Sequence, residues 1–222
     1  MPGSNDQPRS TPLPAPRDAD TARALAKVAA ELSHTYEGTF SPETVAHVVE
    51  ESYDLLAPSA KVPDFLPLLT QRFARDRLLA VAQAEGRVAK PTPEVLFLCV
   101  QNAGRSQMAA GFMSHLSGGR VRVRSAGSQP GERVNPIAAQ AMAEVGVSLS
   151  EAFPKPLTND VVRAADVIVT MGCGDACPVY PGKRYLDWEL ADPAGLTLEQ
   201  VRPIRDRIEQ NVRGLLAEIL PL

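Results

Sequence analysis

The feature of this sequence that most constrains its fold is a short apolar strand that runs directly into a loop and a helix. Residues 95–98 read Val-Leu-Phe-Leu without a polar side chain, which is typical of a strand buried on both faces. A loop follows from Cys99 to Ser106, and the pattern of residues 105–117 predicts a helix directly after it. This order of elements favours an α/β fold.

The rest of the second half of the chain continues this alternation. Further strands are predicted at 120–125, 166–171 and, more weakly, 184–188, and further helices at 135–145, 158–164 and 199–220. The strict polar-apolar alternation of residues 120–125 indicates an outer strand. We therefore expect a doubly wound, parallel, four-stranded sheet, with the Cys99 loop at its carboxyl edge, where such folds bind ligands.

The first part of the chain has a different character. Residues 1–17 contain five prolines and little that can be buried, and we expect a disordered leader there. Residues 18–88 show three amphipathic stretches, one of them opened by Ser41-Pro42, which predict a small three-helix bundle. A stiff, proline-containing linker then leads to a second domain at 94–222.

The predicted bundle contains a run of arginines at residues 72–77 that raises the question of nucleic acid. Between Arg17 and Lys90 there are nine Lys and Arg against eleven Asp and Glu, so the positive field that phosphate binding requires is missing. We expect these arginines to form a solvated helix face and no nucleic acid to bind.

Composition and cysteine content exclude further classes. The net charge is −3, and no apolar run approaches the roughly 18 residues that would cross a bilayer. The first residues lack the apolar segment of a signal peptide, so we expect a cytoplasmic protein that does not bind membranes. The three cysteines, Cys99, Cys173 and Cys177, favour thiol chemistry over a framework of structural disulfides.

The loop from Cys99 to Ser106 has the residues of an anion site with a reactive sulfur. Five residues separate Cys99 from Arg105, enough to curl the backbone around one tetrahedral oxyanion. The helix that follows adds positive potential, and Arg105 can offer two donors to the anion. In that field Cys99 should be a thiolate nucleophile. The residues that we expect to bind the oxyanion are Val100, Gln101, Asn102, Ala103, Gly104, Arg105 and Ser106.

Two more features are predicted at the same edge of the sheet. Cys173 and Cys177 follow the strand at 166–171, and they can form a disulfide, stay two incidental thiols, or be half of a zinc site. Zinc would need two more ligands from Cys99 and three scattered histidines, so we expect no metal. Asp192, in a turn with Pro193, can donate a proton to a leaving oxygen, although Asp-Pro turns are also common structural devices.

These residues resemble the low-molecular-weight protein tyrosine phosphatase superfamily, and the fuller match is to its arsenate reductase branch. The resemblance covers about residues 94–220 and is carried by 99–109, 125–127, 134–136, 169–171 and 192–195. Some actinobacterial arsenate reductases have a helical N-terminal extension, which residues 18–88 resemble. The resemblance also implies the fold of these phosphatases.

The resemblance implies a relay of three thiols and no cofactor. Cys99 would attack arsenate while Asp192 protonates the departing oxygen. Cys173 would then attack Cys99 and release arsenite, and Cys177 would leave a Cys173–Cys177 disulfide for thioredoxin to reduce. Phosphate and sulfate are the expected competing oxyanions, and arsenic detoxification is the expected role.

Several alternatives stay open. Some homologues use mycothiol and mycoredoxin in place of thioredoxin and need only the first cysteine. Some relatives bind potassium near the anion loop, but Ala110 and Lys155 stand where two acidic ligands would be, so we expect no potassium site. A tyrosine phosphatase is a second possible enzyme, although no tyrosine follows Asp192-Pro193. A redox or metalloid sensor is a third possibility.

Overall fold

The computed structural model describes residues 17–60, 63–172 and 178–220. Of the predicted leader only Arg17 is described, and it donates to Asp54 over 2.7 Å. The bundle consists of α1 (Ala19–Thr35), α2 (Pro42–Leu56) and α3 (Leu66–Ala84), with short 3-10 turns at Ala57–Ser59 and Pro63–Phe65. Among the described residues, no helix is long and apolar enough to cross a membrane.

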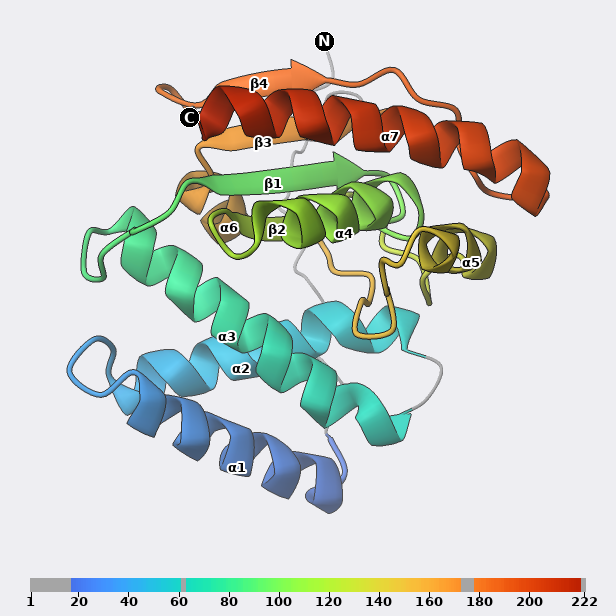
Figure 1. The fold of residues 1–222 in the computed structure, drawn as a ribbon. Helices are drawn as coiled ribbons and strands as arrows, with labels where there is room; N and C mark the ends of the chain where they lie inside the picture. Colours follow the sequence, from blue (N-terminus) through green and yellow to red (C-terminus); the bar gives the residue numbers. More distant parts are fainter. Residues whose placement is uncertain (1–16, 61–62, 173–177, 221–222) are drawn as a thin grey trace, which may run out of the picture.

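The second half of the chain alternates strands and helices as the sequence predicts. Its elements are β1 (Glu94–Cys99), α4 (Arg105–Ser117), β2 (Arg122–Gly127), α5 (Pro136–Glu144), α6 (Asn159–Ala164), β3 (Val167–Met171), β4 (Arg184–Asp187) and α7 (Leu198–Ile219). The four strands are parallel in the order β2-β1-β3-β4, with β2 at an edge. The predicted doubly wound sheet and the helices before it are confirmed (Figure 1).

Local signals in the sequence explain where several helices begin. The Asp18 carboxylate accepts from the amides of Asp20 and Thr21, and the Asn135 side chain accepts from the amides that open α5. Ser41 and Pro42 start α2 in the same way, with the serine as N-cap and the proline in the first turn. Thr197 and Gln200 form a capping box at α7.

The two faces of the sheet are covered by different parts of the chain. On one face, side chains of β1 and β3 pack against α4, α5 and α7, and α7 lies in front of the strands in Figure 1. On the other face Leu96, Leu98 and Ile168 pack against α6 and against Ala80 of α3. The bundle therefore completes the cover of this second face.

The contact between the bundle and the sheet domain corrects one prediction. Arg77 is 7% exposed, and it donates to Asp160 of α6 over 2.8 Å and to Glu51 of α2 over 2.7 Å. Arg72 also points to the second half of the chain. The expectation of a solvated arginine face is therefore wrong for Arg77, whereas the Arg72 side chain is 38% exposed. The buried charge of Arg77 meets one carboxylate within the bundle and one across the contact, as buried charges must.

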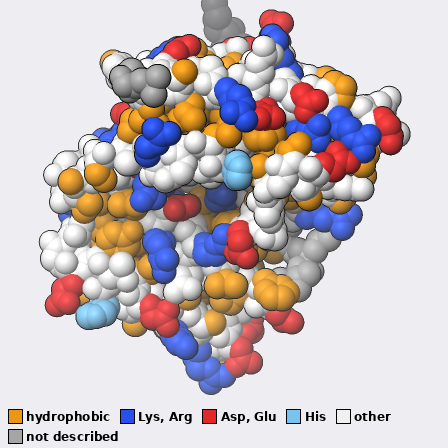
Figure 2. Space-filling model, in the orientation of Figure 1, with side chains coloured by type: hydrophobic (Ala, Val, Ile, Leu, Met, Phe, Trp, Pro, Cys, Tyr) orange, Lys and Arg blue, Asp and Glu red, His pale blue; other side chains and the backbone are white. Residues whose placement is uncertain are grey.

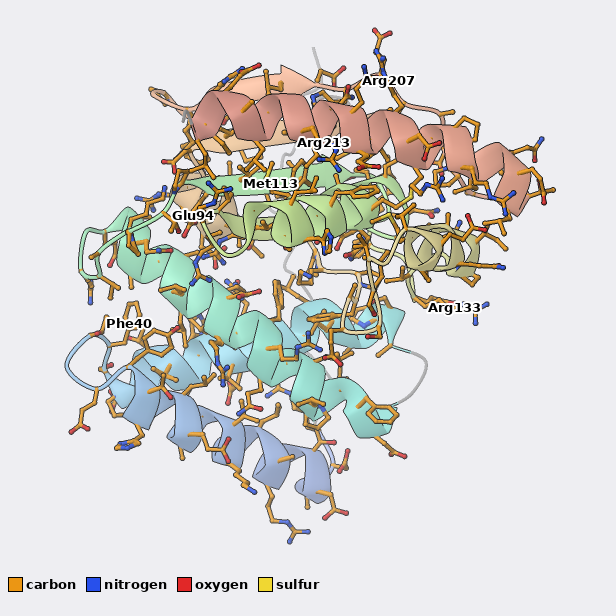
Figure 3. The ribbon with its side chains drawn as sticks, viewed as in Figure 1. Phe40, Glu94, Met113, Arg133, Arg207 and Arg213 are labelled. Carbon is orange, nitrogen blue, oxygen red and sulfur yellow. The ribbon has the colours of Figure 1, made fainter. Side chains whose placement is uncertain are left out.

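A second buried ion pair lies where the two halves meet. Glu94 is fully buried at the start of β1, between α3 and the sheet in Figure 3. Arg124 of β2 donates to it over 3.3 Å and to the carbonyl of Asp76 in α3 over 2.8 Å. This arginine thus ties the edge strand to the bundle. Independent folding of residues 18–88 and 94–222 stays a prediction.

Candidate active site

The loop after β1 has its carbonyl groups turned away from its centre. Each of five successive carbonyls accepts a hydrogen bond: Val100 from Gln129, Gln101 from Gly131, Asn102 from the Gln107 side chain, Ala103 from Asn135, and Gly104 from Met108. Because a trans peptide places N–H opposite C=O, the amides point to the inside of the loop. This is the geometry of an anion-binding nest.

The amides of this loop are available to a ligand. Within the described part of the chain, the amides of residues 101–106 donate to no protein acceptor. The 13-residue helix α4 begins at Arg105, so its N-terminal potential points to the same place. A tetrahedral oxyanion is the ligand that such an arrangement binds.

Asn102 organises the loop from beneath. It is fully buried with φ of 48°, and its Oδ1 accepts from Gln107 Nε2 over 3.1 Å and from the amide of Lys155 over 2.9 Å. These two donors fix the orientation of the amide, so Nδ2 donates to Ser106 Oγ over 2.8 Å. Ser106 Oγ lies 3.0 Å from Cys99 Sγ. Since the hydroxyl oxygen accepts from Asn102, its hydrogen is free to be donated to Cys99 Sγ.

Replacing Asn102 with alanine removes these side-chain hydrogen bonds and leaves a residue at positive φ that has a Cβ but no hydrogen bonds to offset the strain. We expect a loss of about 2 to 4 kcal/mol of stability and a loss of at least about tenfold in phosphate affinity. Asn102→Gly is the matched variant, because it keeps the backbone conformation and loses only the hydrogen bonds. Thermal unfolding and phosphate titration measure both. Equal phosphate affinity in the wild type and Asn102→Gly would show that the side chain does not organise the loop.

Arg105 and Asp192 meet at the mouth of the loop. The Arg105 side chain is 9% exposed, and its Nη2 lies 2.6 Å from Asp192 Oδ2. Asp192 Oδ1 accepts from the amide of Ala194 over 3.0 Å, and its side chain is about half exposed. Because the Asp192 side chain is half exposed, its carboxyl group can move from the guanidinium to a bound anion without creating an empty cavity behind it.

The turn after Asp192 packs directly on the loop. A Cβ on Gly104 would lie 2.5 Å from Cγ of Pro193, so only glycine allows this approach. Asn135 Nδ2 also donates to the carbonyl of Pro193 over 3.4 Å. These contacts set the position of the carboxyl group relative to the loop.

Lys155 contributes to the site through its backbone. Its amide donates to Asn102, whereas its ammonium group donates to the carbonyl of Phe153 over 3.3 Å and lies 4.5 Å from that ring. Burial lowers the pKa of Lys155 to about 8; Asp76 raises it, and Arg72 and Arg124 lower it. Among the described residues, no group of three or more His, Cys, Asp or Glu side chains is placed to hold a metal.

The structure brings Cys99 next to Ser106 and Arg105 next to Asp192, and the catalytic roles of these residues stay predictions. Cys173 and Cys177 lie outside the described residues. Gly172, the residue before them, has φ of 72°, and a Cβ there would lie 3.0 Å from Arg105 Nη1. Gly172 itself therefore lies close to the guanidinium group of Arg105.

Sequence reasoning missed the roles of Gln107 and Phe153. Gln107 is 3% exposed, and its Nε2 donates to Asn102 and to the carbonyl of Phe153 over 2.9 Å. The sequence does show a glutamine in the first turn of the predicted helix, directly before the apolar residues Met108 and Ala109. That position was an available signal. Phe153 acts through its backbone carbonyl, which every residue type has. The residue type at this position therefore gives no signal of that role.

Comparisons with known proteins agree with this geometry. Residues 94–220 match the family described as low molecular weight phosphotyrosine protein phosphatase, and residues 25–82 match a protein-tyrosine-phosphatase-like N-terminal domain. A putative arsenate reductase of Halobacterium salinarum is 38% identical over 60% of this chain and 97% of its own length.

Two solved structures extend the comparison. A thioredoxin-dependent arsenate reductase of Corynebacterium glutamicum has 49% identity and a TM-score of 0.80, over 89% of this chain and 96% of its own. This match includes helices of the bundle as well as the sheet. An arsenate reductase in the phosphate-binding state has 34% identity and a TM-score of 0.53, over 58% of this chain and all of its own.

Proposed function

Since the chain belongs to the low-molecular-weight phosphotyrosine protein phosphatase family, on its arsenate reductase branch, we propose that it reduces arsenate to arsenite through its three cysteines. The observation that carries the proposal is the loop itself. It places Cys99 Sγ 3.0 Å from Ser106 Oγ at the base of an anion nest closed by Arg105. The two other cysteines of the chain, Cys173 and Cys177, supply the electrons.

The first step forms a covalent adduct. The loop amides and Arg105 hold arsenate, and the Cys99 thiolate attacks arsenic. A sulfur–arsenic bond forms and an arsenic–oxygen bond breaks, so the departing oxygen needs a proton. Asp192 would supply it after it moves from Arg105 to the anion, which its half-exposed side chain favours. Arsenic is still in the +5 state at this point.

The second step transfers two electrons. The Cys173 thiolate attacks Cys99 Sγ, a disulfide forms, and the electrons of the sulfur–arsenic bond leave with arsenic as arsenite. Cys177 then attacks Cys173, which frees Cys99 and leaves a Cys173–Cys177 disulfide. A dithiol must reduce this disulfide before the next turnover. Each of the three thiols acts once as a nucleophile, and together they are all the cysteines of the chain.

Thioredoxin is the reductant that we propose. The Corynebacterium glutamicum structure is named as thioredoxin-dependent, and its similarity extends over most of both chains. Mycothiol with mycoredoxin is the alternative, in which Cys173 and Cys177 are dispensable. We propose a cytoplasmic protein that detoxifies arsenic, because the relay requires thiols that are kept reduced.

A coupled assay distinguishes these reductants. NADPH oxidation is followed with arsenate, thioredoxin and thioredoxin reductase for the full chain, Cys173→Ser and Cys177→Ser. The relay predicts that both variants lose at least about 10³-fold in turnover, because no other thiol can complete the exchange. Thermal unfolding at matched concentration controls for folding.

Three outcomes would contradict the proposed function. Normal turnover of Cys177→Ser with thioredoxin would remove that residue from the mechanism. Activity of Cys173→Ser that returns with mycothiol and mycoredoxin would replace the relay by the mycothiol route. Hydrolysis of a phosphotyrosine peptide faster than arsenate reduction would assign the loop to phosphatase chemistry instead.

A further inference from the structure

We propose that the N-terminal bundle positions the anion loop, and that it does so through Arg72 of α3 and the segment 151–155. This role rests on the proposed function only in that the loop around Cys99 binds the oxyanion. It makes the bundle part of the oxyanion site and makes Arg72 a positioning residue that does not touch the substrate.

Arg72 joins the bundle to this segment by three contacts. Its Nη2 donates to the carbonyl of Glu151 over 2.7 Å, and its Nη1 lies 3.3 Å from the Glu151 carboxylate. Its guanidinium carbon lies 5.2 Å from the centre of the Phe153 ring. An arginine that both donates hydrogen bonds and stacks on a ring holds the segment in position and orientation.

Phe153 connects the two halves of the chain within one residue. Its ring packs against Leu56, Leu66 and Phe73, which form an apolar cluster of the bundle. Its carbonyl accepts from Gln107 Nε2, the same group that holds Asn102. A shift of the ring in the bundle therefore moves an acceptor on which the loop depends.

Lys155 completes the connection two residues later. Its amide donates to Asn102 Oδ1 over 2.9 Å, and its carbonyl accepts from the amide of Gly127 over 2.8 Å. Gly127 lies directly under the loop, since a Cβ there would be 2.6 Å from the carbonyl of Val100. The segment is thus bonded to the loop at Asn102 and to the strand that supports the loop.

A groove lies beside this segment. A hollow of about 490 Å³ lies between α3 and α4, and its lining includes Asp76 of α3, Ala110 and Ser114 of α4, and Glu151 and Lys155 of the segment. Figure 2 shows it near the centre of the molecule, with charged side chains around it. Segment 151–155 therefore connects α3 to the loop at this hollow, in addition to the contacts of Arg77 with Asp160 and of Arg124 with Asp76 elsewhere.

The test measures Cys99 without turnover. In the full chain with Cys173→Ser and Cys177→Ser, Cys99 is the remaining thiol, and iodoacetamide alkylates it alone. Inorganic phosphate in the loop should protect it. We expect Arg72→Met to raise the phosphate concentration for half protection by about fivefold or more, and to change the pH profile of alkylation. Phe153→Ala should act in the same direction, and Arg72→Lys should restore part of the loss.

Two control variants match the tested ones. Arg75→Met removes an exposed arginine from the same helix, and Phe65→Ala removes a bundle phenylalanine that is 60% exposed. In both variants phosphate should protect Cys99 at the same concentration as in the parent chain. Equal half-protection in Arg72→Met and Arg75→Met would overturn the role of the bundle and leave the proposed function intact. Failure of phosphate to protect Cys99 in the parent chain would overturn both proposals.

Discussion

Replacing Cys99 with serine is expected to lower arsenate turnover by about 10⁴-fold or more, because no other group in the loop can attack arsenic. The side chain is buried and lies at the end of β1, next to Ser106. Serine has nearly the same shape, so the fold and the anion nest should remain. The turnover of the variant is measured with thioredoxin and, separately, with mycothiol and mycoredoxin.

The control for this variant is anion binding. Phosphate should still raise the unfolding temperature of Cys99→Ser by about as much as that of the wild type, since the amides and Arg105 are unchanged. Loss of turnover with retained phosphate binding assigns the chemistry to the sulfur. Turnover within about tenfold of the wild type would show that the nucleophile lies elsewhere.

Replacing Arg105 with lysine is expected to lower kcat/KM for arsenate by about 10² to 10³-fold. The guanidinium group is almost fully buried and offers two parallel donors, whereas an ammonium group is a single point of charge. Arginine contacts the carbonyl of Leu190 and the carboxylate of Asp192 simultaneously, and a lysine side chain cannot make both contacts. Both anion binding and the placement of Asp192 should therefore suffer.

Arg133→Lys is the matched control for this change. Arg133 is exposed, and in Figure 3 its side chain points away from the body of the molecule. Steady-state kinetics with arsenate should give wild-type values for Arg133→Lys. A similar small loss in both variants would mean that Arg105 supplies general positive charge and does not grip the anion.

The elements of the fold were accessible from local patterns. The apolar run of β1, the alternation in β2 and the cap residues Ser41 and Asn135 each act over a few residues, so their outcome can be seen in the sequence. The place of β2 at the edge followed from its alternation in the same way. The register of the strands depends on pairing across about 30 to 70 residues, which no local pattern encodes.

The contact between the two halves was not accessible in this way. Arg77 belongs to a charged run that fits a solvated helix as well as a buried contact, and its partner Asp160 is 83 residues away. The sequence shows the charge but not the partner. For the same reason the nearly equal numbers of acidic and basic residues in 17–90 suggested solvent-exposed charges. One of these charges, Arg77, instead forms an ion pair with Asp160 across the contact.

The residues of the site divide in the same way, into those that the local sequence indicates and those whose positions depend on distant segments. Cys99, Arg105 and Ser106 stand in one short loop, and their residue types indicate an anion and a nucleophile together. The position of Asp192 against Arg105 depends on the packing of Pro193 on Gly104, which links distant segments. The support of Asn102 by the backbone of Lys155 uses groups that all residues share.

A single-turnover experiment on the full chain tests the three-thiol relay. The reduced protein is mixed with excess arsenate and no external thiol, and arsenite is measured while alkylation and mass spectrometry map the cysteines. The relay predicts one arsenite per chain, one Cys173–Cys177 disulfide and a reduced Cys99 that is alkylated once arsenate is removed and the protein is unfolded. Absence of arsenite, or arsenite formed while Cys173 and Cys177 stay reduced, would contradict it.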